Sequence, residues 1–414
     1  MKTLRFCHVT TFYPPHNFGG DGVNVQRLCR ALVRRGHHVT VLYDPDAFHA
    51  LRNGPAPAEA SEPDGVEVVS LRELGTLSLL LTHQLGRPVI KNREIERVLA
   101  VGDFDVIQFH NVSLVGGPRI FRMGCATKLY MAHDHWLICP THVLWRHKRE
   151  PCPGRECLRC VLRYRRPPQA WRYTAALERA AKHIDAFIAL SEFSRAKHRE
   201  FGFRAEMEVL PCFVPDLGST EAVATGPRPH PRPYFIFAGR LEAIKGVHEI
   251  VAVFRGHQGA DLLIAGDGEY GGELKTLAAG CPQIRFLGRL PLAELDRYYR
   301  HAIAAIVPST TFETFGNVLI EAFRAGIPVI ARRLGPFPEI IDLAQGGELF
   351  STREELVTAI RHLQGDVVVR ERLARNAYAA YQAHWTESVV IPRYLEIVGQ
   401  AAQRREGQRV RDAL

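Results

Sequence analysis

Long apolar runs are missing from this sequence, and their absence argues against a membrane-spanning segment. The longest candidate, LGTLSLLL at residues 74–81, is far shorter than the ~18 apolar residues that a spanning helix needs. The first residues, MKTLRFCHVTTFYPP, lack the continuous apolar core of a secretory signal, because His8 and a pair of threonines interrupt them. We therefore expect this stretch to form a first β-strand and the protein to be cytoplasmic.

Signs of disorder are also missing. Hydrophobic residues make up 46% of the 414 residues and charged residues 23%, which is ordinary for a globular protein. A chain of this length is too long for one core, so we expect two domains of roughly 200 residues each.

The first half of the sequence alternates between strand-like and helix-like segments. TLRFCHVT and HHVTVLY have the pattern of strands, and VNVQRLCRALVRRG between them has the period of a helix that Gly36 closes. The alternation continues through GVEVVSL, a helix near residues 92–100, FDVIQFH and TKLYMAHD. This spacing predicts a parallel sheet that helices cover on both faces.

The alternation stops at residues 214–233, which are rich in Pro and Gly, and then resumes with YFIFAGR, ADLLIAGDG and IPVIAR. We predict an α/β protein with two doubly wound, Rossmann-like domains that face a central cleft. The expected segments are an N-terminal domain (1–213) with an insert (139–172), a linker (214–233), a C-terminal domain (234–385), and a helix (386–414) that returns to the N-terminal domain.

Charged residues follow a strand in the second half. AGRLEAIKG at residues 238–246 places Arg240 and Lys245 between a strand and a helix, where ligands of open α/β sheets bind. A guanidinium and an ammonium there can hold a diphosphate, Arg through its planar fork and Lys as a point charge. A solvated basic loop explains the same residues equally well.

Two glutamates lie on either side of a small-residue turn in TTFETFGNVLIEAFRAGIPVIA, residues 310–331. Glu313 precedes Gly316, and Glu321 lies in the helix that follows. Gly316 allows the N–H groups of the helix start to approach an anion, which the helix dipole also favours. Because Glu313 belongs to the loop, both carboxylates can reach one extended ligand. A sugar at one end and a ribose at the other, with phosphates between them, fits this layout.

These residues carry a resemblance to a known family. The E-x7-E pattern, preceded by GRL-x3-KG, resembles the retaining family 4 glycosyltransferases of GT-B fold, in a subgroup with a cysteine-rich insert. GG at 19–20, RGHHVTVL, AHDHW at 132–136, AGDGE, FLGRL and EAFRAGIPVIA are similar in order and spacing, so the resemblance covers most of the chain.

The resemblance implies a role for each matching residue. Glu313 would bind hydroxyls of the donor sugar, Glu321 the ribose, and Arg240 with Lys245 the diphosphate. The implied catalytic residues are His133, Glu313, Arg240 and Lys245. The implied donor-binding residues are Gly19, Gly20, Arg240, Lys245, Glu313, Thr314, Phe315, Gly316, Asn317 and Glu321.

His133 ends a strand at the expected edge of the cleft, near the anomeric carbon of the sugar by resemblance. Asp134 and His135 are adjacent and compete for the same role, and a lone histidine is more often structural. The family pattern favours His133.

The resemblance also implies the reaction. A sugar would move with retention from a nucleotide diphosphate donor, a UDP-sugar in preference to a GDP-sugar, to a glycan, lipid-linked or small-molecule acceptor. Arg240, Lys245 and the helix start at Asn317 would stabilise the leaving group without a catalytic cofactor, since no convincing Asp-x-Asp motif is present. Pro336 and Pro338 depart from the family pattern, and each removes an N–H from its turn.

Three rival functions are considered. GGDGVNV suggests a dinucleotide-dependent oxidoreductase, but it lacks the third glycine and the tight turn, so that fingerprint fails. A nucleotide-sugar epimerase of the same fold would need no acceptor. A non-catalytic zinc or nucleic-acid-binding protein built on residues 139–172 is less favoured.

Nine cysteines need an explanation, because cytoplasmic proteins rarely hold disulfides. We expect five to be small buried side chains: Cys7, Cys29, Cys125, Cys212 and Cys281. The other four have the spacing C-x12-C-x4-C-x2-C and offer the ligands of a structural zinc site: Cys139, Cys152, Cys157 and Cys160. His142 or His147 could replace one ligand, and a disulfide or free thiols are alternatives.

The insert is also basic, with nine Lys and Arg against two Glu between Arg146 and Arg172. Trp145, Tyr164 and Trp171 add aromatic side chains. An anionic membrane surface or a lipid diphosphate acceptor suits this mixture, through Arg159, Arg163, Arg165 and Arg166. No nucleic-acid-binding fold accompanies it, so no nucleic-acid partner is expected, and a solvated basic loop is the alternative.

Overall fold

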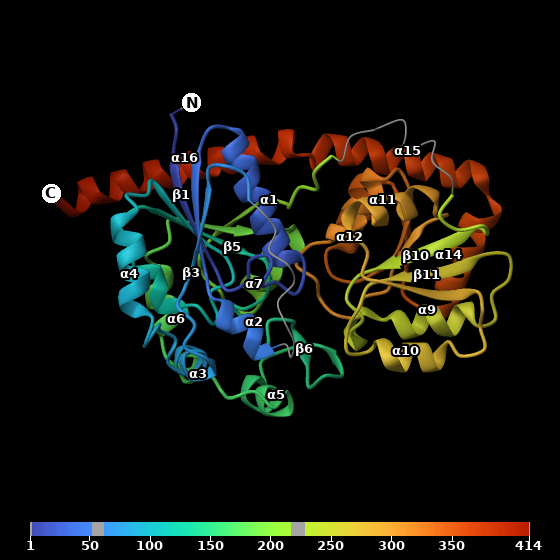
Figure 1. Ribbon diagram of the computed structural model, residues 1–414, viewed down its shortest axis with the longest axis horizontal. Coiled ribbons are helices and arrows are strands. Elements are labelled where there is room, and N and C mark those ends of the chain that lie inside the picture. Colours follow the sequence, from blue (N-terminus) through green and yellow to red (C-terminus); the bar gives the residue numbers. More distant parts are fainter. Residues whose placement is uncertain (1, 52–61, 217–227, 414) are drawn as a thin grey trace. The chain divides into compact units, whose positions relative to one another are not determined.

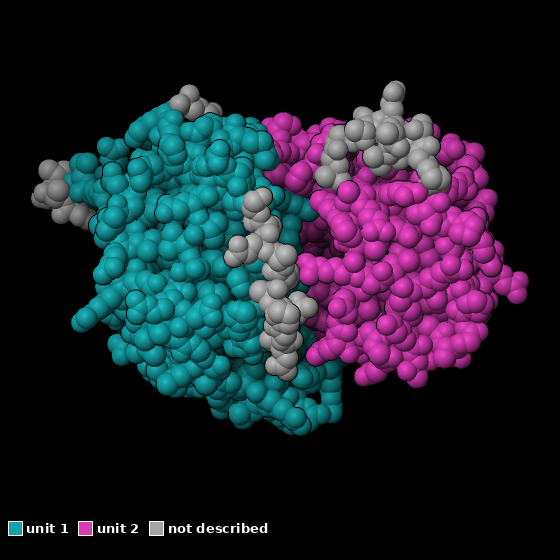
Figure 2. All heavy atoms as spheres, viewed as in Figure 1, with its two compact units in different colours: residues 1–211, 390–414 teal, residues 212–389 magenta. Residues whose placement is uncertain are grey.

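The computed structural model describes residues 2–51, 62–216 and 228–413. Contacts divide the chain into two compact units, Met1–Pro211 with Val390–Leu414 and Cys212–Val389 (Figure 2). Residues 214–216 and 228–233 of the predicted linker are irregular, and the rest of that linker lies outside the described residues.

The first unit is built on a sheet with the strand order β3-β2-β1-β4-β5-β8-β9. All neighbouring strands are parallel, and β1 pairs with β2 from Arg5↔His38 to Thr10↔Tyr43. The strands are β1 (Arg5–Thr10), β2 (His38–Tyr43), β3 (Val66–Ser70), β4 (Val106–Phe109), β5 (Thr127–Ala132), β8 (Ala186–Ala189) and β9 (Met207–Val209).

Strands β4, β5 and β8 are buried along their whole length, as expected for a parallel sheet that is covered on both faces. In the first helix, Leu28 and Leu32 are buried, and Gly36 follows the helix end in the left-handed conformation. The helical segments are α1 (Gly20–Arg34), α2 (Pro45–Leu51), α3 (Thr76–Leu85), α4 (Asn92–Val101), η1 (Pro118–Arg122), α6 (Ala176–Ala181) and α7 (Glu192–Glu200).

The insert between β5 and α6 has little regular structure. A short antiparallel hairpin pairs Trp145 with Pro151 and Arg146 with Glu150. Its elements are β6 (Trp145–Arg146), β7 (Glu150–Pro151), α5 (Cys157–Arg163) and the 3-10 helix η2 (Ala170–Tyr173).

The second unit repeats the architecture with a parallel sheet in the order β12-β11-β10-β13-β14-β15. Helices α9 and α10 lie on one side of this sheet, and α11 and α12 on the other (Figure 1). The strands are β10 (Tyr234–Ala238), β11 (Asp261–Ala265), β12 (Ile284–Gly288), β13 (Ala305–Val307), β14 (Val329–Arg332) and β15 (Gly347–Phe350). The helices are η3 (Ala243–Lys245), α9 (Val247–Phe254), α10 (Gly271–Leu277), α11 (Leu292–His301), α12 (Asn317–Arg324), α13 (Phe337–Ala344), α14 (Arg353–Gly365), α15 (Val367–His384) and α16 (Glu387–Ala413).

The last helix, α16, joins the first unit from Val390 onward. Tyr394 Oη donates to Gln108 Oε1 at 3.1 Å, and Arg405 Nη1 lies 3.3 Å from Asp185 Oδ2. Within the described ranges, no helix is long and apolar enough to cross a membrane. The predicted α/β fold with two Rossmann-like domains is confirmed.

Candidate active site

A lysine and a glutamate from different loops meet in the second unit. Lys245 Nζ lies 2.6 Å from Glu313 Oε1, and Ser309 Oγ donates to the same carboxylate oxygen at 2.9 Å. Lys245 ends η3 after β10, and Glu313 follows β13, which is the neighbour of β10 in the sheet. The contact therefore lies at the carboxyl ends of two adjacent strands, where open α/β sheets bind ligands.

Backbone contacts fix the two loops against each other. The Thr310 N–H donates to the Ile244 carbonyl at 2.9 Å, and Thr310 Oγ1 donates to it at 3.0 Å. Gly246 has a φ of 70°, and a Cβ there would lie 2.1 Å from the Pro308 carbonyl oxygen. Only glycine fits this conformation and this approach, so Gly246 allows Lys245 to reach Glu313.

The surroundings keep Glu313 ionised. Burial alone would raise the pKa of this carboxyl group. The charge of Lys245, the hydrogen bonds from Lys245 and Ser309, and the charge of Arg240 outweigh burial and hold the pKa below its ordinary value. The site thus contains a carboxylate that accepts hydrogen bonds at neutral pH.

Arg240 lies in the same loop as Lys245 and is about half exposed. Its Nη1 is 2.6 Å from Glu242 Oε1. Because this guanidinium is held at one end by a neighbour and open to solvent at the other, it can turn toward an anion at small cost. Arg240, Lys245 and Glu313 are thus brought together, as their sequence positions suggest.

Helix α12 begins directly after this carboxylate. Gly316 precedes it and provides no side-chain cap for its first N–H groups. Thr314 and Phe315 connect Glu313 to this start, and Phe315 is buried. Glu321 lies near the middle of α12, where its charge acts on Tyr299 of α11.

The two prolines that depart from the family pattern begin helix α13. Pro336 precedes this helix, and Pro338 lies in its first turn, where an N–H would have no helical partner. Gly335, with a φ of 65°, keeps the turn close to the Glu313 backbone. The turn thus accepts both prolines without breaking the helix.

Three histidines form a chain in the first unit. His8 Nδ1 lies 2.9 Å from His110 Nε2, and His110 Nδ1 lies 2.9 Å from His133 Nε2. All three are buried, at β1, directly after β4 and directly after β5. Burial lowers the pKa of His8 to about 3 and that of His133 to about 4. His133 is therefore a neutral imidazole whose orientation is set by its neighbours.

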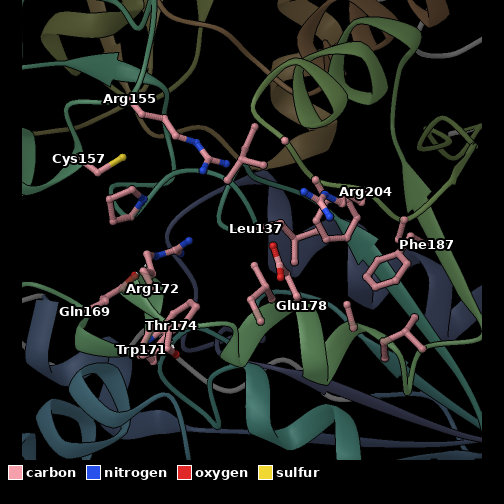
Figure 3. A pocket seen from close by; sticks show the side chains of 18 of the residues that line it. Leu137, Arg155, Cys157, Gln169, Trp171, Arg172, Thr174, Glu178, Phe187 and Arg204 are labelled. Atoms are coloured by element: carbon pink, nitrogen blue, oxygen red, sulfur yellow. Dashed lines mark hydrogen bonds between the residues drawn. The ribbon is translucent and has the colours of Figure 1, made fainter.

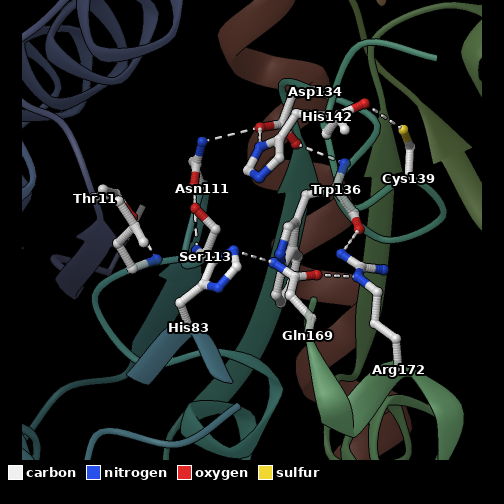
Figure 4. A network of polar contacts seen from close by, with 12 residues as sticks. Thr11, His83, Asn111, Ser113, Asp134, Trp136, Cys139, His142, Gln169 and Arg172 are labelled. Carbon is white, nitrogen blue, oxygen red and sulfur yellow. Dashed lines mark hydrogen bonds and ion pairs between the residues drawn. The ribbon is translucent and has the colours of Figure 1, made fainter. Parts of the chain in front are cut away.

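The two residues that follow His133 make contacts with His142 of the insert (Figure 4). Asp134 Oδ2 lies 2.7 Å from His142 Nδ1 and accepts from Asn111 Nδ2 at 2.9 Å. The His135 N–H donates to the His142 carbonyl. Asp134 and His135 thus fix the loop to the insert.

Gly19 and Gly20 lie at the start of α1. The Asn17 side chain donates to the Gly19 carbonyl at 2.7 Å and accepts from the Gly19 N–H at 3.4 Å. Gly22 is closer packed, because a Cβ there would lie 2.7 Å from Asn17 Oδ1. The glycine-rich loop is thus shaped by Asn17.

The four cysteines of the insert lie in one neighbourhood, and all nine cysteines are free. Burial, followed by the charge that Cys139 would carry, raises the pKa of the Cys157 thiol. Among the residues with described positions, no three His, Cys, Asp or Glu side chains are placed to hold a metal ion. The arrangement as it stands does not form a tetrahedral site, and zinc stays a prediction.

Neither histidine of the insert is open as a substitute ligand. Asp134 engages His142, and His147 Nε2 lies 3.0 Å from Glu156 Oε2. Of the five scattered cysteines, Cys7, Cys29 and Cys212 are buried as expected. The expectation is wrong for two members of that group: Cys125 is exposed and Cys281 is half-buried, since both lie in surface turns.

The basic patch is confirmed only in part. Four of its arginines are exposed: Arg159, Arg163, Arg165 and Arg166. We expected Trp171 to lie on the surface with the arginines. It is instead buried, and its indole N–H donates to the His83 carbonyl at 3.0 Å. Exposed Leu158 and Leu162 of α5 replace it beside the arginines.

Sequence reasoning missed His8, His110 and Ser309. His8 interrupts an apolar strand. His110 and His133 each end an apolar strand, FDVIQFH and KLYMAH, and this shared position is the signal that could have linked them. Ser309 is an ordinary residue after a strand and has no such signal.

Two families match the sequence. The one described as Glycosyltransferase Family 4 matches residues 18–216, and the one described as Glycosyl transferases group 1 matches residues 219–380. The glycogen synthase of Mycobacterium tuberculosis is 27% identical over 398 residues, which cover 90% of this chain and 89% of that protein. The GDP-mannose-dependent alpha-(1-6)-phosphatidylinositol monomannoside mannosyltransferase of the same organism is 26% identical, covering 81% and 82%.

Solved structures share the fold. Sucrose-phosphate synthase from Thermosynechococcus elongatus superposes with a TM-score of 0.71 at 18% identity, covering 98% of this chain and 99% of that one. Anabaena HepE, solved in complex with UDP and glucose, superposes with a TM-score of 0.66 at 17% identity, covering 96% and 99%. These likenesses place both units in the GT-B architecture.

Proposed function

This chain belongs to the glycosyltransferases of GT-B fold that are like family 4, and from that premise we propose that it transfers a sugar with retention from a nucleotide diphosphate sugar. The observation that carries the proposal is the contact of Lys245, Glu313 and Ser309, with Arg240 beside it. Cations that hold a diphosphate and a carboxylate that holds sugar hydroxyls lie within one set of strand-to-helix loops.

The chemistry follows from these groups. The bond between the anomeric carbon and the leaving phosphate oxygen breaks, and negative charge builds on the diphosphate. Lys245, Arg240 and the N–H groups at the start of α12 stabilise this charge without a catalytic metal. The acceptor oxygen bonds to the same face of the sugar, and its proton passes to the leaving phosphate.

Lys245 has a second role before the donor arrives. Glu313 holds the ammonium at 2.6 Å, so each neutralises the other. A donor phosphate competes for Lys245 and frees Glu313 to accept from sugar hydroxyls. Exchange of one ionic partner for another keeps the cost of desolvation low.

The relatives support two donors and a lipid-linked acceptor. HepE was solved with UDP, which supports a UDP-sugar, whereas the mannosyltransferase uses GDP-mannose and acts on a phosphatidylinositol glycoside by its name. The exposed arginines and leucines of α5 support an acceptor presented at an anionic membrane surface.

Donor binding and variant kinetics test the proposal. Thermal shift with UDP-, GDP- and ADP-sugars should raise the melting temperature for one class, because the donor binds the native state only. Glu313→Ala should lower kcat by about a hundredfold, and Glu321→Ala should mainly raise the donor KM. Exposed Glu294→Ala on α11 is the matched control. Wild-type turnover in both glutamate variants would reject the assignment, and an epimer formed without acceptor would favour the epimerase.

A further inference from the structure

The first unit contains a cavity of about 1290 Å³ that is lined by none of the residues assigned to the donor site (Figure 3). Its walls come from the loop after β5, the insert, α6, β8 and the segment that leads into β9. Small-molecule sites usually measure about 300–1,000 Å³, so this cavity suits a larger ligand.

Most of the lining is apolar. Leu137 and Ile138 come from the loop after β5, and Trp171, Phe187 and Phe203 add aromatic rings. These five side chains are buried in the protein, whereas Leu158 of α5 and Tyr173 of η2 also line the cavity and are exposed to solvent. The cavity therefore offers apolar surface that extends from the interior to the outside.

Three arginines at the same cavity have no carboxylate partner among the described residues, although Arg155 donates to the Phe201 carbonyl. Figure 3 shows the guanidinium groups of Arg155, Arg172 and Arg204 directed toward it from different sides, with Glu178 between them. Throughout the described part of the chain, no carboxylate lies within ion-pair distance of these three arginines.

Two carboxylates of the wall have arginine partners of their own, and one of these arginines, Arg404, also lines the cavity. Asp185 pairs with Arg405 at 3.3 Å and Glu208 with Arg404 at 3.7 Å. Arg172 is held in place, since its guanidinium lies 4.4 Å from the Trp171 ring centroid and donates to Gln169 and to the Trp136 carbonyl. A fixed guanidinium with no carboxylate partner suits an anionic ligand.

The cavity is connected to the predicted sugar site by one loop. His133 begins the loop after β5, and Leu137 and Ile138 of the same loop form part of the cavity wall. A ligand in the cavity therefore contacts the same loop that carries His133.

We propose that this cavity binds the phosphate-bearing apolar anchor of a lipid-linked acceptor. The chain lies against the apolar wall, and the phosphate lies against Arg155, Arg172 and Arg204. The inference rests on the proposed function, because it names the acceptor class of that reaction.

Calorimetry on the full chain with prenyl diphosphates tests it. Farnesyl diphosphate should bind at least tenfold more tightly than inorganic diphosphate or farnesol alone, and geranyl diphosphate should bind more weakly, by about fourfold for each methylene no longer buried. Binding should persist in saturating UDP, which occupies the second unit. Displacement by UDP, or equal affinity for inorganic diphosphate, would overturn the proposal.

Substitutions in the cavity distinguish binding of the phosphate from binding of the apolar chain. Arg155→Ala with Arg204→Ala should weaken farnesyl diphosphate at least tenfold without changing farnesol. Both arginines are exposed, and the loss of the Arg155 bond to the Phe201 carbonyl is checked by the unchanged farnesol affinity. Ala205→Trp fills the cavity and should weaken both probes, and exposed Arg97→Ala on α4 is the control. Unchanged affinities in these variants would place the ligand elsewhere.

The outcome is independent of the test of donor chemistry. Normal nucleotide-sugar binding without farnesyl diphosphate binding would reject this inference alone. Farnesyl diphosphate binding without donor binding would reject the proposed function and leave the cavity as an amphipathic anion site.

Discussion

The two units share one architecture but carry different chemistry at the ends of their strands. In the first unit, His8, His110 and His133 form a buried and neutral chain. In the second unit, Lys245 and Glu313 form a charged pair with Arg240 nearby. One architecture therefore carries a neutral histidine chain in the first unit and an ionic pair in the second.

The difference matches the ligands that each unit would meet. A diphosphate needs fixed positive charge, which the second unit offers. An acceptor hydroxyl needs a hydrogen-bonding group, and a neutral imidazole can donate or accept. We therefore predict that replacing charged residues of the second unit lowers kcat. We also predict that low pH lowers the free energy of unfolding through the histidines of the first unit.

The largest effect should come from the charged site. Lys245→Ala should lower kcat by about a thousandfold, roughly 4 kcal/mol, because the leaving diphosphate loses its nearest cation. Transfer should survive EDTA for the same reason. Steady-state kinetics with and without EDTA give the answer, with exposed Lys275→Ala as the control. Loss of activity on EDTA that Mg²⁺ restores would show that a metal, not Lys245, carries the charge.

The neutral site predicts how stability depends on pH. In the unfolded chain a histidine has a pKa near 6.5, whereas burial lowers those of His8 to about 3 and His133 to about 4. The unfolded state thus binds more protons below pH ~6.5, so the free energy of unfolding should fall as the pH drops from there toward 4. Each of these histidines should contribute about 3 kcal/mol to the loss.

Urea unfolding at several pH values measures this effect. The variant with His8→Leu and His110→Leu should make the curve shallower between pH 4 and 6.5, with the contribution of His133 remaining, while nucleotide-sugar binding by the second unit stays unchanged. His38→Leu, an exposed histidine of the same sheet, is the control and should keep the wild-type slope. An equally steep curve in the double variant would mean that other groups cause the acid sensitivity.

The insert adds positive charge to the first unit, and substitution of its cysteines tests whether it binds a metal. Metal analysis should find close to one zinc per chain. Cys157→Ser with Cys160→Ser should remove the metal and about 2 kcal/mol of stability, because the insert has few apolar residues of its own. Cys281→Ser in the second unit is the matched control. A metal-free native protein would reject zinc.

The smallest effect should come from single arginines of the basic patch. Arg163→Ala should weaken binding to anionic liposomes by about 1 kcal/mol, most clearly at low salt. Replacement of Arg159, Arg163, Arg165 and Arg166 together should weaken it further and leave donor binding intact. Arg97→Ala should have no effect. Unaltered liposome sedimentation of the fourfold variant would remove the membrane from the proposal.

Local patterns were enough to predict the charged site. Arg240, Lys245 and Glu313 each follow a strand, and parallel strands bring their carboxyl ends to one edge. Their meeting thus follows from strand order and needs little knowledge of packing.

The histidine chain depends on more distant information. His8 and His110 are 102 positions apart, and their contact arises because β1 and β4 pair with Cys7 opposite Ile107. Register and side-chain direction cannot be obtained from one strand alone. The cavity was missed for a related reason, since its walls come from segments whose packing the sequence does not specify.

The arrival of α16 in the first unit has a consequence for synthesis and for protein engineering. The second unit is one continuous segment, whereas the first lacks its last helix until residues beyond Val390 have left the ribosome. Ile391, Tyr394 and Ala401 are fully buried there, so their partners stay uncovered until then. Expression of residues 1–211 alone should yield an aggregation-prone fragment, and adding residues 390–414 as a separate peptide should rescue it.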